Sequence, residues 1–543
     1  MLKRNHFTFA FILFIMLLFT FCASEREEAE EVSSSAYDDL LSLFEEFREF
    51  QKPKVTDGVP DYSPTAMREQ RKGLKKFQDR LAAMDISSWP TSHRVDYHIV
   101  RAEMNGLEFD HRVLRPWSRD PGFYLKSQSG AGPSYYGRVR LPSLPLSDEG
   151  MAEVRMQLKA VPEIYTQAKE NLTEASGDLA ILALHFMDDE IALYRNIATR
   201  LAEHHPELVP DAERAMDAVE DYGHWLEVNK NKMIAPAGLG KENYDWWMKN
   251  VQLFPYSWDE LMVIAQNEYS RAIALLKLEE HKNRFLPKLK PVATEAEYHR
   301  RDKKFKQVML NFLHKKKIFT VPDYLVVTRD RPWARVPARQ GGDKRDFFEQ
   351  SKDRLPLHML CHNFIGHNLD ALRHRRDNRP IRGMERLYTI DMIRSEGLAY
   401  GMEEIMMHLG LFEEYPRGRE IYYIGQAFRA VRSIVDLKLH SNEFTLMEGQ
   451  KYFVENTPYG WTLPDGREVW YETETTLRFP GWHTGMSAGK TQLLTLIADR
   501  ADQRGDEFNL REFMDEFFAS GMIPISLIRW EMTDLEDEIK MLR

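Results

Sequence analysis

Apolar residues recur at three- and four-residue spacings along most of the chain, which is the pattern of amphipathic α-helices. The stretches that show it most clearly are residues 38–50, 67–84, 149–172, 259–281 and 298–317. Prolines and glycines separate these stretches, as expected for the loops between helices. The pattern predicts a mainly α fold, with one large helical domain over residues 37–543 arranged in one or two lobes.

Two shorter stretches have the composition of β-strands. Residues 324–330 read YLVVTRD, and residues 468–479, which follow the turn sequence Pro-Asp-Gly, read EVWYETETTLRF. Both are rich in β-branched and aromatic residues, and the second alternates in part. They predict a small β hairpin near the candidate site described below.

The N-terminus has the features of an export signal. Residues 1–6 are basic, residues 7–21 are apolar, and an acidic, serine-ended linker occupies residues 24–36. Cys22 stands where a bacterial lipoprotein carries its lipid, although Phe21 before it is larger than the usual residue there. Residues 1–23 therefore form a lipoprotein signal, a signal cleaved near Ala23, or an uncleaved anchor. Each form predicts an exported protein of the cell envelope that meets the membrane through its N-terminus only.

Composition narrows the classes of function. A formal charge of -10 over 543 residues argues against nucleic-acid binding, which needs a basic face. The two cysteines, Cys22 and Cys361, form no disulfide framework. After the N-terminus, no run reaches the roughly 18 apolar residues of a membrane span. The expected partner is a peptide or another small molecule.

The segment LPLHMLCHNFIGHNLD, residues 355–370, concentrates side chains that bind metals. These are His358, Cys361, His362 and His367. A glutamate-bearing helical stretch, SEGLAYGMEE, begins about thirty residues later. Many zinc peptidases form their metal site from two histidines on a helix and a downstream glutamate. Those enzymes place a general-base glutamate directly after the first histidine, whereas this chain has Asn363.

The spacing of the histidines restricts which of them can share a metal ion. His358 and His362 are four residues apart, so they project about 40° apart on a helix. His362 and His367 are five residues apart, which is about 140° on an ideal helix. The second pair can share a metal only if the helix breaks between them, and Gly366 offers a point for such a break.

Two later stretches place polar residues on one helical face. The first contains Glu396, Tyr400 and Glu403, and the second contains Arg429, Arg432, Asp436 and His440. Polar residues within an apolar helix need partners, which a buried site would supply. On this interpretation Tyr400, Arg429, Arg432 and Asp436 line the site. The second stripe could equally be a structural ladder of salt bridges.

Other polar residues have simpler interpretations. Isolated histidines such as His185, His374 and His408 are typical of surfaces or of satisfied core positions. Cys361 is typical of a small buried hydrophobe. The basic run at residues 372–382 is either a solvated loop or a clamp for a substrate carboxylate.

Several separated blocks resemble the bacterial family named domain of unknown function 885, whose helical fold and metal motif look like those of zinc-dependent peptidases. Early and middle blocks match at residues 85–96, 239–244 and 255–261. The family motif His-Glu, two residues, Pro-Gly-His appears here as His-Asn-Phe-Ile-Gly-His at residues 362–367, without the proline and with asparagine for glutamate. The later Glu-Gly-Trp-Ala block appears at residues 396–399 as Glu-Gly-Leu-Ala.

The resemblance continues towards the C-terminus. The helix from Arg429 to His440 matches, and the last block, Arg-Tyr-x-Pro-Gly-Gln, appears at residues 478–482 as Arg-Phe-Pro-Gly-Trp. Met486 stands where the family has a tyrosine, while Gly489 is retained.

The resemblance implies a zinc ion held by His362, His367 and Glu396. It implies catalytic positions at Asn363, His440 and Arg478, with His358, Cys361 and Glu403 as alternative ligands or base. The alignment needs a one-residue gap at the missing proline. Without the gap, Cys361 would replace the first histidine and His362 would replace the glutamate.

The implied function is that of an exported zinc-dependent peptide hydrolase with a large helical, zinc-peptidase-like domain. Asn363 can hydrogen-bond a water molecule but cannot accept its proton, and Met486 removes a phenol that could stabilise an oxyanion. The alternative is an impaired pseudoenzyme that binds a peptide or another ligand in the retained cleft, with the zinc kept or lost.

Overall fold

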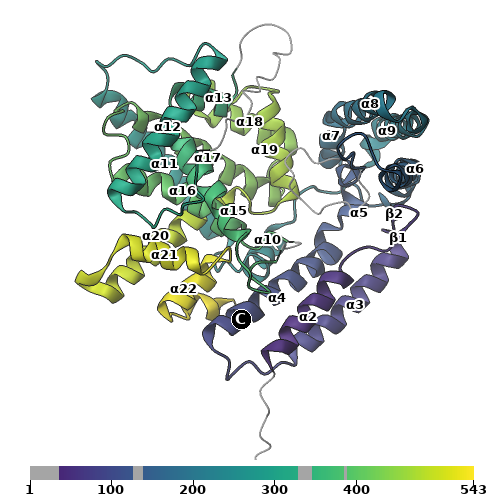
Figure 1. Ribbon diagram of the computed structural model, residues 1–543, viewed down its shortest axis with the longest axis horizontal. Coiled ribbons are helices and arrows are strands. Elements are labelled where there is room, and N and C mark those ends of the chain that lie inside the picture. The colour runs from purple at the N-terminus through teal and green to yellow at the C-terminus, as the bar shows by residue number, and fades with distance from the viewer. Residues whose placement is uncertain (1–35, 126–138, 328–344, 385–387, 543) are drawn as a thin grey trace, which may run out of the picture.

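The computed structural model describes residues 36–125, 139–327, 345–384 and 388–542, which are almost entirely helical (Figure 1). The mainly α prediction is therefore confirmed. The export signal and Cys22 lie outside the described residues. Within the described ranges, no helix combines the length and the apolar character needed to cross a membrane.

The N-terminal part is a layer of long helices beside the C-terminal end of the chain (Figure 1). Its elements are α2 (Tyr37–Phe50), β1 (Val55–Thr56), β2 (Val59–Pro60), α3 (Pro64–Ala82) and α4 (Thr91–Phe109). The strands β1 and β2 pair antiparallel between α2 and α3. Helix α4 also contacts α22 (Ile525–Thr533), which joins this layer to the main body.

A second lobe follows, with a hydrophobic core of its own. It is formed by α6 (Asp148–Asn171), α7 (Gly177–His185), α8 (Met187–His204) and α9 (Val209–Asn229). Short helical turns, η1 (Asp110–Leu114), α5 (Pro116–Arg119) and η2 (Pro121–Tyr124), connect α4 to this lobe. Leu158, Leu201 and Tyr222 are fully buried in its core. The described residues thus form two hydrophobic cores, as a two-lobed arrangement requires.

The main body surrounds one central helix, α17 (Gly418–His440), which is buried over nearly its whole length. Helix α11 packs along α17, and α16 packs along α20. The other helices of the main body are α10 (Lys241–Asn250), α11 (Trp258–Lys282), α12 (Glu295–Lys316), α13 (Phe347–Arg354), α14 (Leu357–Leu360), η5 (Cys361–Asn368), α15 (Leu369–His374), α16 (Met392–His408), α18 (Leu446–Asn456), α19 (Arg467–Arg478), α20 (Thr484–Arg504), α21 (Leu510–Ala519) and α23 (Asp537–Met541).

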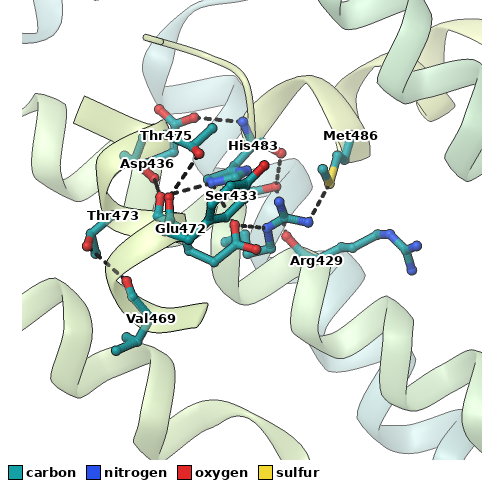
Figure 2. Close-up of polar contacts among 12 residues, drawn as sticks. Arg429, Ser433, Asp436, Val469, Glu472, Thr473, Thr475, His483 and Met486 are labelled. Carbon is teal, nitrogen blue, oxygen red and sulfur yellow. Dashed lines mark hydrogen bonds and ion pairs between the residues drawn. The ribbon is translucent and has the colours of Figure 1, made fainter. Parts of the chain in front are cut away.

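The predicted β hairpin near the site is wrong. The stretch from Glu468 is helical and forms α19, and the described part of residues 324–330 contains no strand. The threonines that suggested a strand fit a helix because their hydroxyls donate to carbonyls four residues earlier, as Thr473 does to Val469 at 2.9 Å (Figure 2). Helical spacing also lets Arg478 pair with Glu474 at 2.6 Å.

The basic run at residues 372–382 is packed at Arg373 and Arg382, while Arg375, Arg376, Asn378 and Pro380 between them are exposed, as a solvated loop predicts. Arg382 is buried and pairs with Asp96 at 2.7 Å and Glu531 at 2.8 Å. The guanidinium of Arg373 lies over the ring of Phe518 at 3.6 Å. These contacts fasten the run to α4 and to the C-terminal helices.

Two glycines of the motif blocks allow three helices to approach closely. A Cβ added to Gly366 would lie 2.6 Å from the backbone of Ala399, and one added to Gly397 would lie 2.3 Å from the backbone of Gly489. Real Cβ atoms do not approach so closely, so η5, α16 and α20 can pack this tightly only because these side chains are absent.

We expect Gly397→Ala to lower the free energy of unfolding by about 1–3 kcal/mol, because the new methyl group would push α16 and α20 apart. Gly401→Ala on the same helix is the matched control, because its Cβ would meet only the end of the flexible Leu493 side chain. Guanidinium denaturation followed by circular dichroism measures both. Equal stability of the two variants would contradict this account.

Candidate metal centre

His362 and His367 lie on the same face of one helical segment. Residues Cys361–Asn368 form a π-helix, η5, in which the chain bonds five residues back instead of four. The wider turn brings residues five apart into line, and the two Nε2 atoms are 3.1 Å apart. The helix therefore does not break at Gly366, and the widened turn removes the 140° separation expected of an α-helix.

Glu396 on α16 completes a group of three possible metal ligands. Its carboxylate oxygens lie 3.7 Å from His362 Nε2 and 3.6 Å from His367 Nε2. Zinc bonds of about 2.0–2.2 Å in tetrahedral geometry place ligand atoms about 3.3–3.5 Å apart. The three side chains thus already have nearly the spacing that a zinc ion requires. They are also the one such group of His, Cys, Asp or Glu found among the described residues.

The other ring nitrogens of the two histidines face different partners. His362 Nδ1 lies 3.1 Å from Glu403 Oε1, and His367 Nδ1 lies 3.3 Å from Ser395 Oγ. In metal sites, a partner at one ring nitrogen orients the imidazole and leaves the other nitrogen for the metal. Here both Nε2 atoms point into the space beside Glu396.

The surroundings favour the protonation states that bind a metal. Burial, with the charge of Arg429, lowers the pKa of His362 well below its usual value, so this ring is neutral. Burial alone would raise the pKa of Glu396, but the two histidines and Arg432 together lower it to about 2. One oxygen of this ionised carboxylate has no hydrogen-bond partner among the described residues. Imidazole and carboxylate donors in this arrangement fit a zinc ion.

Glu403 is fixed behind the histidines by Arg429 on α17. The guanidinium lies 2.6 Å from Glu403 Oε1, and both side chains are almost fully buried. This ion pair connects α16 to α17 directly behind the candidate ligands. Because Glu403 lies on the Nδ1 side of His362, it does not face the space where the Nε2 atoms meet.

We expect Arg429→Met to lower the free energy of unfolding by about 3–5 kcal/mol, because it leaves the carboxylate of Glu403 buried without its cation. Lys451→Met, which breaks an exposed pair with Glu455, should change it by at most about 1 kcal/mol. Chemical denaturation at neutral pH measures both values. A loss for Arg429→Met no greater than that of the control would contradict the buried pair.

A second buried network, formed by charged side chains, lies beside the candidate ligands, and the sequence did not predict it. Glu472 on α19 forms an ion pair with Arg432 at 2.7 Å and lies 3.0 Å from His483 Nε2. Figure 2 shows Glu472 and His483 in the same group of polar contacts as Ser433 and Asp436. The network went unnoticed because the Glu472 region was assigned to a strand, which would have turned alternate side chains away from α17.

The remaining residues of the α17 stripe fix other helices. Asp436 accepts backbone N–H groups of His483 at 3.0 Å and Thr484 at 3.3 Å, where α20 begins. A carboxylate at this end of a helix is stabilised by the unpaired N–H groups and the helix dipole. His440 lies about 12 Å along α17 from Arg432, and its Nε2 is 2.9 Å from the carbonyl of Thr476. For Asp436 and His440, these contacts favour a structural role of the stripe over a role in lining the site.

Arg478 and Met486 occupy different surroundings. Arg478 pairs with Asp120 at 3.0 Å and with Glu474, which ties α19 to the segment that leads into the second lobe. Arg432 Nη1 donates a weak hydrogen bond to the sulfur of Met486 at 3.5 Å. Of these two residues, Met486 is therefore the one linked to the candidate ligands, because it contacts Arg432, whose charge acts on Glu396.

The alternative ligands are not part of the three-residue group. His358 is buried, with Nε2 3.1 Å from Ser351 Oγ, and burial lowers its pKa to about 3. Cys361 is fully buried, and burial raises the pKa of its thiol, so it has the properties of a core residue. Tyr400 is fully buried, with the Arg429 guanidinium over its ring at 5.3 Å. Asn363, next to His362 on η5, is partly exposed.

The family model described as "Bacterial protein of unknown function (DUF885)" matches residues 49–313 and 366–532, which is most of the chain. The protein belongs to the DUF885 family. The predicted membership of this family is thus confirmed, although the matched ranges leave out residues 314–365, and with them His362 and Asn363 of the motif. No curated protein matches the chain.

Two solved structures resemble this DUF885 protein over nearly their whole length. One is titled a "putative lipoprotein of unknown function" from Shewanella oneidensis, with a TM-score of 0.72, 14% identity, and coverage of 92% of this chain and 100% of that one. The other, a "putative lipoprotein" from Colwellia psychrerythraea, has a TM-score of 0.67, 16% identity, and coverage of 91% and 98%. At these identities the likeness concerns the fold alone.

Proposed function

We propose that this DUF885 protein is a zinc-dependent peptide hydrolase of low turnover. The observation that carries the proposal is the meeting of two histidine Nε2 atoms and the Glu396 carboxylate, with 3.1–3.7 Å between ligand atoms. The Nδ1 atoms of the two histidines face Glu403 and Ser395, so the Nε2 atoms are presented as ligands.

His362, His367 and Glu396 would hold the ion and leave a fourth position open, as catalytic zinc sites do. Zinc bound there would lower the pKa of a coordinated water and polarise a peptide carbonyl. Asn363 can orient a water molecule through its amide but cannot take its proton. Absence of a general base commonly costs about 10²- to 10⁴-fold in rate, which is the reason we propose a low turnover.

A second candidate function is the binding of peptides without turnover. It is favoured because Asn363 supplies no base and because the two nearest glutamates are already paired with cations. Glu403 is paired with Arg429, and Glu472 is paired with Arg432 and His483. Neither carboxylate is free to replace the missing base in this arrangement.

We also propose that the protein works at the cell envelope. The N-terminal sequence has the pattern of an export signal that ends at Cys22. The two structural neighbours carry the word lipoprotein in their titles, which supports the same location.

Metal analysis and peptide cleavage test the proposal together. The purified protein should contain about one zinc per chain by plasma mass spectrometry. A peptide library should show slow cleavage that a chelator abolishes and added zinc restores. Zinc without any cleavage would favour the peptide-binding alternative, and protein that takes up no zinc when it is offered would overturn both the hydrolase and the metal site.

A further inference from the structure

A cavity separate from the three candidate zinc ligands lies where the N-terminal helices meet the main body. The volume open to the centres of water molecules is about 70 Å³, which holds roughly five waters. Its walls include the aromatic side chains Tyr62, Trp117, Phe123, Trp247 and Tyr388. None of the three candidate zinc ligands lines it.

Buried acceptors without partners lie in this aromatic wall. Asp110 is 5% exposed; its Oδ2 accepts the hydroxyl of Tyr388 at 2.6 Å, while its Oδ1 has no hydrogen-bond partner among the described residues. Gln252 is 2% exposed; its amide donates to the carbonyl of Thr389 at 3.2 Å, while its Oε1 is likewise unpaired in the described part of the chain. Asp110 and Gln252 thus line the cavity with buried oxygens that lack donors among the described residues, and leaving them so is costly.

Among the described residues around the cavity, no cation pairs with the carboxylate of Asp110. Arg478, the cation that lines the cavity, is already paired with both Asp120 and Glu474. His111, next to Asp110, has its pKa lowered to about 4 by burial, so it is neutral at physiological pH. Burial raises the pKa of Asp110 to about 7, as expected for a carboxyl that no neighbouring cation stabilises.

We propose that this cavity binds a small organic cation, namely a protonated primary amine on an aromatic or compact apolar body. The ammonium would donate to Asp110 Oδ1, and Gln252 Oε1 is a second acceptor on the wall. Aromatic faces attract organic cations and also pack against an apolar body. An anion would face the same acceptors and be repelled, because Arg478, the one cation among the described residues of the wall, is already paired.

Benzylamine and benzyl alcohol test the proposal, since they have nearly the same shape and differ in charge and donor number. In calorimetric titrations at neutral pH, the unaltered protein should bind benzylamine about tenfold or more tightly than benzyl alcohol. Equal binding of the two compounds, or binding of neither at millimolar concentration, would overturn the proposal. This comparison requires no variant and does not depend on the zinc site.

A variant at Asp110 tests whether benzylamine binds in this cavity. Asp110→Asn keeps the shape of the side chain and removes its charge, so the preference for benzylamine should fall to about twofold or less. Asp85→Asn makes the same chemical change at a partly exposed position outside the cavity and should leave the preference intact. If Asp110→Asn, shown to be folded by circular dichroism, retains the full preference, the assigned cavity is wrong.

Discussion

Replacing Asn363 by glutamate should raise the rate of zinc-dependent peptide hydrolysis by about 10²- to 10⁴-fold, the range that a general base contributes. Position 363 directly follows His362 on η5 and is partly exposed. A carboxylate there could take the proton that the amide of Asn363 cannot accept. The measurement is kcat with the peptides that the unaltered protein cleaves slowly, in protein loaded with zinc.

Asn363→Gln is the matched control, because it lengthens the side chain as glutamate does and supplies no base. It should leave kcat within a few-fold of the unaltered protein. If Asn363→Glu binds zinc and is no faster than Asn363→Gln, the missing base is not what limits the reaction. The peptide-binding alternative would then become the better account of the site.

His362→Ala together with His367→Ala should reduce the zinc content from about one ion per chain to background. Two of the three candidate ligands disappear, and one carboxylate alone does not hold zinc against a competing buffer. Plasma mass spectrometry after dialysis measures the metal, and circular dichroism shows whether the variant is folded.

His408→Ala is the control for the histidine variants, since His408 is a largely exposed residue at the end of α16, the helix that carries Glu396. Its zinc content should equal that of the unaltered protein. Zinc retained in the double histidine variant would show that the metal binds elsewhere. Zinc lost also from His408→Ala would point to a general effect on folding.

The spacing of apolar residues was enough to predict a helical protein, because each long helix buries one face and exposes the other. The short stretch at residues 468–479 was assigned to the wrong structure. Its apolar and polar residues do separate at helical spacing, but its aromatic residues and threonines favour strands, and that composition suggested a strand. Its helical form depends on partners in other elements, such as Arg432 for Glu472.

The ligand candidates were found from residue types and motif order, but their geometry was not. Ideal helical angles placed His362 and His367 on different faces, and a local widening into a π-helix brought them together. Ser395 gave no signal of its own, because a serine beside a glutamate is common. Only the packing of α16 against η5 places its hydroxyl 3.3 Å from His367 Nδ1.

By itself, the sequence of this DUF885 protein determined the helical class and the family, and it singled out two histidines and one glutamate as candidate ligands, with Asn363 after the first histidine. These features are local, since they depend on residue types and spacings within one segment. Only the tertiary structure decided that Nε2 of His362 meets Nε2 of His367 beside Glu396, and that Arg478 and His440 lie in other contacts. Such distances are set by helices far apart in the chain, and glycines as distant as Gly366, Gly397 and Gly489 allow those helices to touch.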